Sequence, residues 1–497
     1  MSCINKFIYV SAMSSKQMEM FRSYLDRSHM EHKQYQYDGV KWALENELRD
    51  NSPCSVRGGF IADEMGLGKT IMMIGLMYCN FVKRTLIVVP PILVEQWYLQ
   101  IYRTTGHKAL VYYGIKKKTI DLDAILKAPI VITTYGAIWK KTETGPEGKG
   151  LELSLLHKVA WSRIIFDEAH HLRNSGTSRY ISARLLMAKS RWLVSGTPVQ
   201  NKKRDFYSLC SILRMPSKYY SNPANLPDIA RRFILKRTKK QVGICIADIC
   251  KERTIVKWAN EKEMRLAEEL HACLPFSGVG AGAGGRGGLL SDALGNNMLQ
   301  IIMRARQSCI YPKLMMGFLQ KICYNDNGVD EAFESSSSSS SKLTAVVKTI
   351  LARKDNGNGK LVFCHFREEI DEIARRLKAG GMVNVATFDG RSKQRGFIFK
   401  EKHDVLILQI QTGCEGLNLQ DNYNEVYFVS PHWNPAIEDQ AIARCHRIGQ
   451  AKTVYVQRFE MAAFQGEDED RTPINVEKYI GNVQKQKREL ASKIIRD

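Results

Sequence analysis

Short apolar runs rich in β-branched residues alternate with longer helical stretches in two separate parts of the chain. In the first part the runs lie at 85–89, 130–133, 163–166 and 192–194. In the second part they lie at 361–363, 383–386, 405–408, 426–429 and 454–456. Near-continuous apolar runs interleaved with helical stretches are typical of strands in a parallel sheet that helices cover on both faces. The sequence therefore predicts an α/β fold with two parallel-sheet lobes.

The segments outside the predicted lobes divide the chain further. A chain of 497 residues exceeds what a single hydrophobic core usually covers. The glycine-rich stretch 277–288 and the serine run 335–341 are typical of a flexible loop and a mobile linker. We expect an N-terminal extension at 1–30, a first lobe at 31–240, a helical interlobe region at 241–341, a second lobe at 342–470 and a C-terminal helix at 471–497.

Charge and cysteine content restrict the partners that we expect. The chain carries 73 Lys and Arg against 51 Asp and Glu, a formal net charge of +22. Such an excess favours a polyanionic partner, although a merely soluble basic protein has the same signature. The 12 cysteines include no Cys-x-x-Cys pair, so we expect packed thiols in an intracellular protein and no structural zinc. No secretory signal or membrane-length apolar stretch is present, and we expect no membrane partner.

The stretch Asp63–Thr70, DEMGLGKT, has the residue types of a loop that cradles phosphates. Its two glycines would let backbone N–H groups approach phosphate oxygens at the start of a helix. Lys69 would reach the β- and γ-phosphates, and the Thr70 hydroxyl would bind Mg²⁺. Asp63 stands where the general pattern has its first glycine, so the pattern alone does not decide nucleotide binding.

A carboxylate pair, Asp167 and Glu168, closes the predicted strand at 163–166 within an Asp-Glu-Ala-His box. If this strand shares a sheet with the phosphate loop, both carboxylates would face that loop. Asp167 suits a Mg²⁺ ligand, and Glu168 suits orientation and deprotonation of an attacking water. A surface acidic pair after a buried strand is the alternative.

Two arginines, Arg444 and Arg447, lie three positions apart in the segment 440–450, QAIARCHRIGQ. A helix would place both on one face. From there they would stabilise charge on a transferring phosphoryl group as arginine fingers. Arginines with a purely structural role often show the same spacing, and that alternative remains open.

Together with SGTPVQN at 195–201, these segments resemble the Swi2/Snf2 branch of the superfamily 2 helicase-like ATPases, from residue 35 to about residue 494. DEMGLGKT, with Asp63 in its first position, is that branch's own form of the phosphate loop. The resemblance implies two RecA-like parallel-sheet lobes with helical insertions between them. Further segments that carry it are 35–42, 88–90, 95–97, 133–135, 237–239, 304–312, 430–435 and 446–450.

The resemblance also implies roles for individual residues. Gln36 is the candidate for adenine contact, and the nucleotide site would further include Asp63, Glu64, Met65, Gly66, Leu67, Gly68, Lys69, Thr70, Asp167 and Gly416. Catalysis would fall to Lys69, Glu168, Arg444 and Arg447, and Mg²⁺ binding to Thr70 and Asp167. Nucleic acid would contact Thr133, Thr134, Thr412 and Trp433, although a buried tryptophan is the commoner fate.

The second-lobe motif at 411–419 departs slightly from the family pattern. Cys414 and Glu415 stand where the family usually has a second glycine and a valine. We expect the geometry of the loop to survive, because Gly416 and the three residues after it are kept. The interlobe cysteines show no ligand pairs, which argues against the zinc-binding RING insertion and ligase activity of some relatives. We therefore expect a nearly bare motor.

The function that the resemblance implies is ATP-dependent, Mg²⁺-dependent translocation along double-stranded DNA without strand separation. Such a motor remodels or displaces DNA-bound proteins, including nucleosomes. This substrate favours location in the nucleus, or at a viral replication site or in a virion for a virus-encoded chain. Two alternatives remain: a strand-separating DNA or RNA helicase, and a non-catalytic DNA-binding scaffold with a vestigial ATP site.

Overall fold

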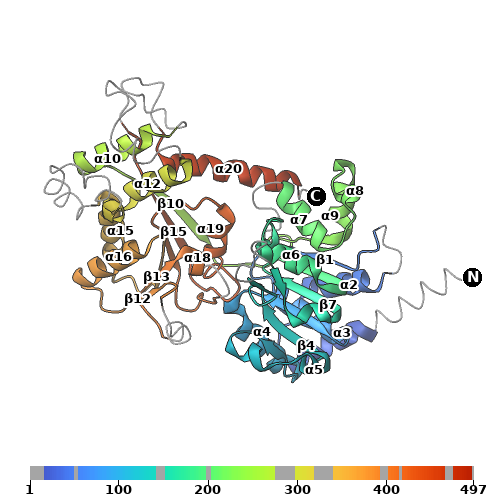
Figure 1. The fold of residues 1–497 in the computed structure, drawn as a ribbon. Coiled ribbons are helices and arrows are strands. Elements are labelled where there is room, and N and C mark those ends of the chain that lie inside the picture. The colour runs from blue at the N-terminus through green and yellow to red at the C-terminus, as the bar shows by residue number, and fades with distance from the viewer. Residues whose placement is uncertain are drawn as a thin grey trace, which may run out of the picture. The chain divides into compact units, whose positions relative to one another are not determined.

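The chain is organised as two α/β units, each built on a parallel sheet with flanking helices (Figure 1). The computed structural model describes residues 16–49, 54–141, 151–196, 203–274, 297–317, 340–391, 401–413, 417–464 and 474–494. Lobe 1 comprises residues 1–245 together with 489–497, and lobe 2 comprises residues 246–488. No helix among the described residues is long and apolar enough to cross a membrane.

Lobe 1 contains a seven-stranded sheet in the order β3-β4-β2-β7-β8-β1-β9, in which every neighbouring pair is parallel. Its strands are β1 (Gly58–Ile61), β2 (Thr85–Val89), β3 (Leu110–Tyr112), β4 (Ile130–Thr134), β7 (Ala160–Asp167), β8 (Met187–Val194) and β9 (Ile234–Leu235). A small antiparallel pair, β5 (Trp139–Lys141) with β6 (Leu151–Leu153), stands apart from it. The four apolar runs predicted in this half all lie within strands of the large sheet.

Helices cover both faces of the lobe 1 sheet, so the lobe has two hydrophobic clusters. Along β7, Ile164 and Phe166 belong to one cluster and Ile165 to the other, because successive strand residues point to opposite faces. The helices are α2 (Gln34–Leu48), α3 (Lys69–Cys79), α4 (Val94–Thr105), α5 (Leu122–Lys127), α6 (Ser178–Leu185), α7 (Lys203–Ile212), α8 (Ser217–Tyr220) and α9 (Leu226–Phe233). A further helix at 16–27 buries Phe21 and Tyr24 in the second cluster, so part of the expected extension packs on this lobe.

Lobe 2 contains a six-stranded sheet in the order β10-β15-β14-β11-β13-β12, again parallel throughout. Its strands are β10 (Ile249–Val256), β11 (Lys360–Cys364), β12 (Val385–Phe388), β13 (Val405–Gln409), β14 (Glu425–Phe428) and β15 (Val454–Met461). Its helices are α10 (Glu261–Ala272), α12 (Met298–Ile310), α15 (Ser341–Ala352), α16 (Arg367–Ala379), α18 (Ile410–Gly413) and α19 (Pro435–Ile442), and α20 (Val476–Ile494) begins in this lobe.

The region 241–341, which we expected to be helical, supplies strand β10 to the lobe 2 sheet, where it pairs with β15. The middle of β10 is Lys251-Glu252-Arg253, and all three side chains are exposed. Because β10 is an edge strand, it lacks the continuous apolar run that marks a central strand.

The last residues of the serine run belong to the folded lobe. Ser340 is buried and caps α15, where its hydroxyl accepts a hydrogen bond from the Leu343 N–H at 3.1 Å. The Ser341 hydroxyl donates to Glu263 at 2.5 Å. One residue later, the fully buried Lys342 ammonium pairs with Glu477 at the start of α20. Residues 335–339 lie outside the described part of the chain.

Candidate active site

The phosphate-loop candidate connects β1 to α3 at the carboxyl edge of the lobe 1 sheet. Gly66 and Gly68 have φ of 91° and 79°, a left-handed region that side chains other than glycine rarely adopt. Helix α3 begins at Lys69, so the first N–H groups of the helix have no partner within it and suit an anion. The Lys69 ammonium donates to the carbonyl of Asp63 at 2.9 Å.

Three neighbouring strands end at the same level of this edge. The register pairs Val194 of β8 with Ile61 of β1 on one side and with Asp167 of β7 on the other. The loop after β8 then turns toward the phosphate loop, since a Cβ on Gly196 would lie 3.5 Å from Lys69 Nζ. The structure therefore brings Lys69, Asp167 and Gly196 to one edge. Residues 197–201 of the SGTPVQN motif lie outside the described residues.

Asp167 ends β7 with a buried carboxylate. Burial and the adjacent Glu168 raise the pKa of Asp167 above its ordinary value. Glu168 itself has a φ of 49°, an uncommon backbone conformation for a residue other than glycine. Its carboxylate lies 3.2 Å from Nδ1 of the buried His170. A carboxylate pair held this way at the end of a strand matches the predicted location of the acidic box.

Two buried aromatic residues hold Asp167, and the sequence did not reveal this role. The indole N–H of Trp97 donates to Asp167 Oδ2 at 2.7 Å, and the Tyr135 hydroxyl donates to the Asp167 carbonyl at 2.7 Å. Both residues belong to segments that carry the family resemblance, at 95–97 and 133–135. They are 70 and 32 residues from Asp167 in sequence, so no local pattern could have indicated the contacts.

Gln36 lies against the phosphate loop. Its amide donates to the carbonyl of Leu67 at 3.2 Å, and a Cβ on Gly68 would lie 2.4 Å from Gln36 Nε2. The adenine-contact candidate and the loop are therefore in direct contact.

Asp63 differs from the other loop residues, because its carboxylate is fully buried and paired with Arg237. Both of its carboxylate oxygens accept hydrogen bonds from Arg237, and its contact with a nucleotide stays a prediction.

The residues expected to contact nucleic acid are buried or half-buried where the structure describes their side chains. Thr133 and Thr134 have buried side chains at the end of β4, and the Thr133 hydroxyl donates to the Tyr112 carbonyl at 2.8 Å. Trp433 is half-buried, and its ring meets that of Tyr479 edge-on at 6.2 Å. The side chain of Thr412 lies outside the described part of the structure, as does the whole of Gly416.

Arg444 and Arg447 do not lie on a helix, contrary to the prediction. Helix α19 ends at Ile442, and both arginines lie in the turns that follow. The Leu419 N–H donates to the Arg444 carbonyl at 3.0 Å, which ties these turns to the motif at 411–419. Arg444 Nη1 lies 3.4 Å from the Leu417 carbonyl, and Arg447 donates to Asn418. Burial and the neighbouring Arg444 lower the pKa of Arg447.

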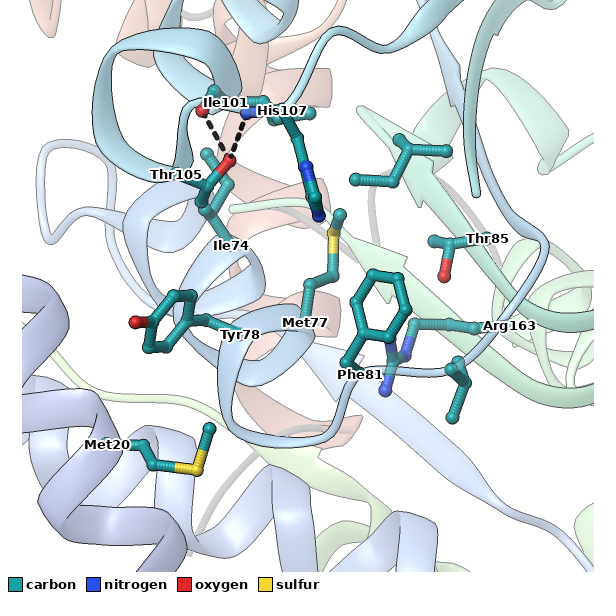
Figure 2. A pocket seen from close by; sticks show the side chains of 12 residues that line it. Met20, Ile74, Met77, Tyr78, Phe81, Thr85, Ile101, Thr105, His107 and Arg163 are labelled. Atoms are coloured by element: carbon teal, nitrogen blue, oxygen red, sulfur yellow. Dashed lines mark hydrogen bonds between the residues drawn. The ribbon is translucent and has the colours of Figure 1, made fainter. Parts of the chain in front are cut away.

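A pocket of about 270 Å³ lies elsewhere on lobe 1. Its lining includes Thr85 and Ile130, the first residues of β2 and β4, together with Phe81 just after α3 (Figure 2). These positions mark the amino ends of the strands, whereas Asp167 and the phosphate loop lie at the carboxyl ends. In parallel α/β sheets ligands bind beyond the carboxyl ends, so the pocket is separate from the candidate active site.

Comparison with known proteins identifies related sequences. A model of the SNF2-related domain matches residues 35–314, and a model of the helicase conserved C-terminal domain matches residues 341–449. The chain is 27% identical over 450 residues to the "Probable global transactivator" of Orgyia pseudotsugata multicapsid polyhedrosis virus, covering 86% of this chain and 85% of that protein. It is 25% identical to "DNA repair protein RAD5B" of Arabidopsis thaliana, covering 81% of this chain and 43% of that protein.

The chain also matches "Chromodomain-helicase-DNA-binding protein 7" of Homo sapiens at 27% identity, covering 89% of this chain and 15% of that protein. It thus spans less than half of the repair and chromodomain relatives. Among solved structures, the "Sulfolobus solfataricus SWI2/SNF2 ATPase core in complex with dsDNA" aligns with 93% of this chain and 92% of its own, at 21% identity and a TM-score of 0.38. Because the SNF2-related model matches more than half of the sequence, this chain belongs to the SNF2 family of helicase-like ATPases.

Proposed function

We propose that this chain hydrolyses ATP at the carboxyl edge of the lobe 1 sheet. The observation that carries the proposal is the convergence of Lys69, the Asp167–Glu168 pair and Gly196 on that edge. Lys69 and the loop N–H groups would bind the phosphates, and Gln36 would contact the adenine. Glu168 would orient an attacking water and accept its proton.

The residues present fit a Mg²⁺ ion. The Thr70 hydroxyl and the Asp167 carboxylate are hard oxygen ligands, and Mg²⁺ in such sites takes one or two carboxylates together with substrate phosphates. When bound, the ion would neutralise phosphate charge. Trp97 and the Glu168 N–H would keep the Asp167 carboxylate oriented, through bonds of 2.7 and 2.9 Å. A cation would also favour the charged form of this buried carboxylate.

We propose that Arg444 and Arg447 take part in the phosphoryl-transfer step. Their guanidinium groups would stabilise the charge that develops on the transferring phosphoryl group. The support for this role is local. Arg444 is buried and Arg447 is partly buried beside residues 417–419, and burial together with the neighbouring Arg444 charge lowers the pKa of Arg447.

The proposed partner is duplex DNA, along which the motor would move without separating the strands and so displace or remodel bound proteins such as nucleosomes. The excess of 73 basic over 51 acidic residues supports a polyanionic partner. The names of the repair and chromodomain relatives also support DNA. Contacts through phosphates would give weak sequence preference. The proposed location is the nucleus or a viral replication site, in line with the viral and chromodomain relatives.

Displacement of a third strand from a triplex tests movement along the duplex. Wild-type protein with ATP should release the third strand and should leave a forked duplex of equal length paired. The Glu168→Gln variant lacks the proposed base and serves as the matched control. It should neither release the third strand nor open the fork. Unwinding of the fork without triplex release would replace this proposal with the strand-separating alternative.

A further inference from the structure

A single arginine of the Arg237–Lys239 segment contacts three separate parts of the nucleotide-binding region. Arg237 Nε and Nη2 donate to the two carboxylate oxygens of Asp63 at 3.1 and 2.5 Å. Its Nη1 donates to the carbonyl of Tyr35, and its guanidinium carbon lies 5.5 Å from the centre of the Tyr35 ring. Its Nη2 also lies 3.5 Å from Met72 Sδ on α3.

The surroundings are shaped to receive this guanidinium. A Cβ on Gly39 of α2 would lie 2.9 Å from Arg237 Nη2, so the glycine leaves the space that the side chain fills. The backbone adds a second set of contacts: the Glu64 N–H donates to the Arg237 carbonyl at 2.9 Å. The Lys239 N–H donates to the Glu64 carboxylate at 2.8 Å, and the Lys239 ammonium lies 3.3 Å from it.

We infer that Arg237 is a positioning residue that fixes the phosphate loop relative to the adenine segment. Asp63 opens the loop and Tyr35 directly precedes Gln36, so one planar, bidentate group sets the spacing between the two ends of the nucleotide site. The same contact neutralises a buried carboxylate beside the position proposed for a triphosphate. Without Arg237, the negative charge of Asp63 would repel that anion. The inference rests on the proposed function, because it assumes that the loop binds a nucleotide.

The test is equilibrium binding of a fluorescent ADP to the full chain, for wild type, Asp63→Asn, Arg237→Met and the double variant. We expect Arg237→Met to weaken ADP binding on the order of 10- to 100-fold, the range for groups that orient primary ligands. The double variant should bind more tightly than Arg237→Met, because it removes the uncompensated charge. Arg231→Met is the matched control, since the Arg231 side chain is 72% exposed on α9, and it should bind as wild type does.

Circular dichroism of each variant separates a folding defect from a binding defect. If Arg237→Met does not fold, Arg237→Lys and the double variant carry the test, since lysine keeps the charge without the bidentate geometry. A folded Arg237 variant with wild-type ADP affinity overturns the inference and leaves the proposed function standing. Wild-type protein that fails to bind ADP overturns both. A purely structural role would lower the unfolding temperature without changing the affinity of the folded protein.

Discussion

The phosphate-loop edge of lobe 1 and the arginine turns of lobe 2 hold their charged groups differently. In lobe 1, both carboxylate oxygens of Asp167 accept hydrogen bonds, from Trp97 and from the Glu168 N–H. In lobe 2, Arg444 is buried, its Nη1 contact with Leu417 is 3.4 Å long, and its Nε is a buried donor without a partner among the described residues.

The difference is consistent with different parts for the two regions in the proposed reaction. A carboxylate whose partners are already in place is held in one orientation, which suits a metal ligand. A buried guanidinium donor without a partner costs free energy, so its retention needs a reason. The reason that we propose is an anion that reaches it during the reaction. Lobe 1 would then bind nucleotide, and the lobe 2 arginines would act mainly on the transition state.

The largest expected effect comes from Arg447→Ala. Loss of an arginine finger should reduce ATP turnover on the order of 10³-fold or more, while ATP affinity changes little. Steady-state hydrolysis and equilibrium binding measure the two separately. Arg375→Ala is the control, because the Arg375 side chain is 67% exposed on α16. A loss of less than about tenfold would leave Arg444 as the finger candidate.

Glu168→Gln should have the next largest effect. Removing the general base should lower turnover about 10²- to 10⁴-fold and leave ATP binding intact, because the amide keeps the shape of the carboxylate. The same two assays apply. Turnover near the wild-type value would contradict the role of Glu168 and shift the base to another group.

Trp97→Phe tests whether the Trp97 hydrogen bond holds the Asp167 carboxylate in the orientation needed for Mg²⁺. The substitution removes the donor to Asp167 Oδ2, and we expect the Mg²⁺ concentration for half-maximal nucleotide binding to rise about tenfold. Trp161→Phe is a matched control, since Trp161 is equally buried and its indole donates to the Leu156 carbonyl at 2.9 Å, away from the site. Equal responses of the two variants would mean that the tryptophan acts only through packing.

The last prediction concerns the stability of lobe 2 rather than its chemistry. His271 is buried, its Nδ1 donates to Ala267, and its Nε2 accepts the Val476 N–H at 3.0 Å. Burial lowers the pKa of His271 from 6.5 to about 4. Between these values the unfolded chain binds the proton and the folded chain does not, so stability falls as the pH drops. The loss should reach at most about 3 kcal/mol.

Urea unfolding at about pH 5 and about pH 7.5 measures this slope, which follows from the linkage between protonation and stability. His271→Gln should flatten it, whereas His107→Gln, at an exposed position in lobe 1, should not. A slope that survives His271→Gln would assign the acid sensitivity to other groups.

The parts of the fold that the sequence predicted are those with a local signature. All nine runs lie at least partly within the two sheets. Eight of them lie on strands with a neighbour on each side, which in parallel sheets are generally buried on both faces, whereas 383–386 reaches the edge strand β12 and Val383 is exposed. β10 escaped prediction because an edge strand carries charges, and the two arginines were wrongly placed on a helix because the chain turns after Ile442 to bond with Leu419. The hydrophobic periodicity of a sequence describes one element at a time and does not predict tertiary contacts between elements.

The candidate site divides in the same way. Lys69 and the Asp167–Glu168 pair follow strands within short motifs, and the structure brings them to one sheet edge. The supporting residues have no such local motif for their roles, because Trp97 and Arg237 bond to partners 70 and 174 positions away in the sequence. Their contacts depend on the order of the strands in the sheet, and the sequence pattern did not predict that order.

Steady-state ATP hydrolysis without nucleic acid, and with single-stranded DNA, duplex DNA or duplex RNA, tests the central claim most directly. The account predicts low basal turnover and strong stimulation by duplex DNA. Because the proposed contacts are to phosphates, the DNA concentration for half-maximal stimulation should rise steeply with salt. Stimulation mainly by single strands or RNA, or no hydrolysis under any condition, would contradict a duplex-DNA-stimulated ATPase.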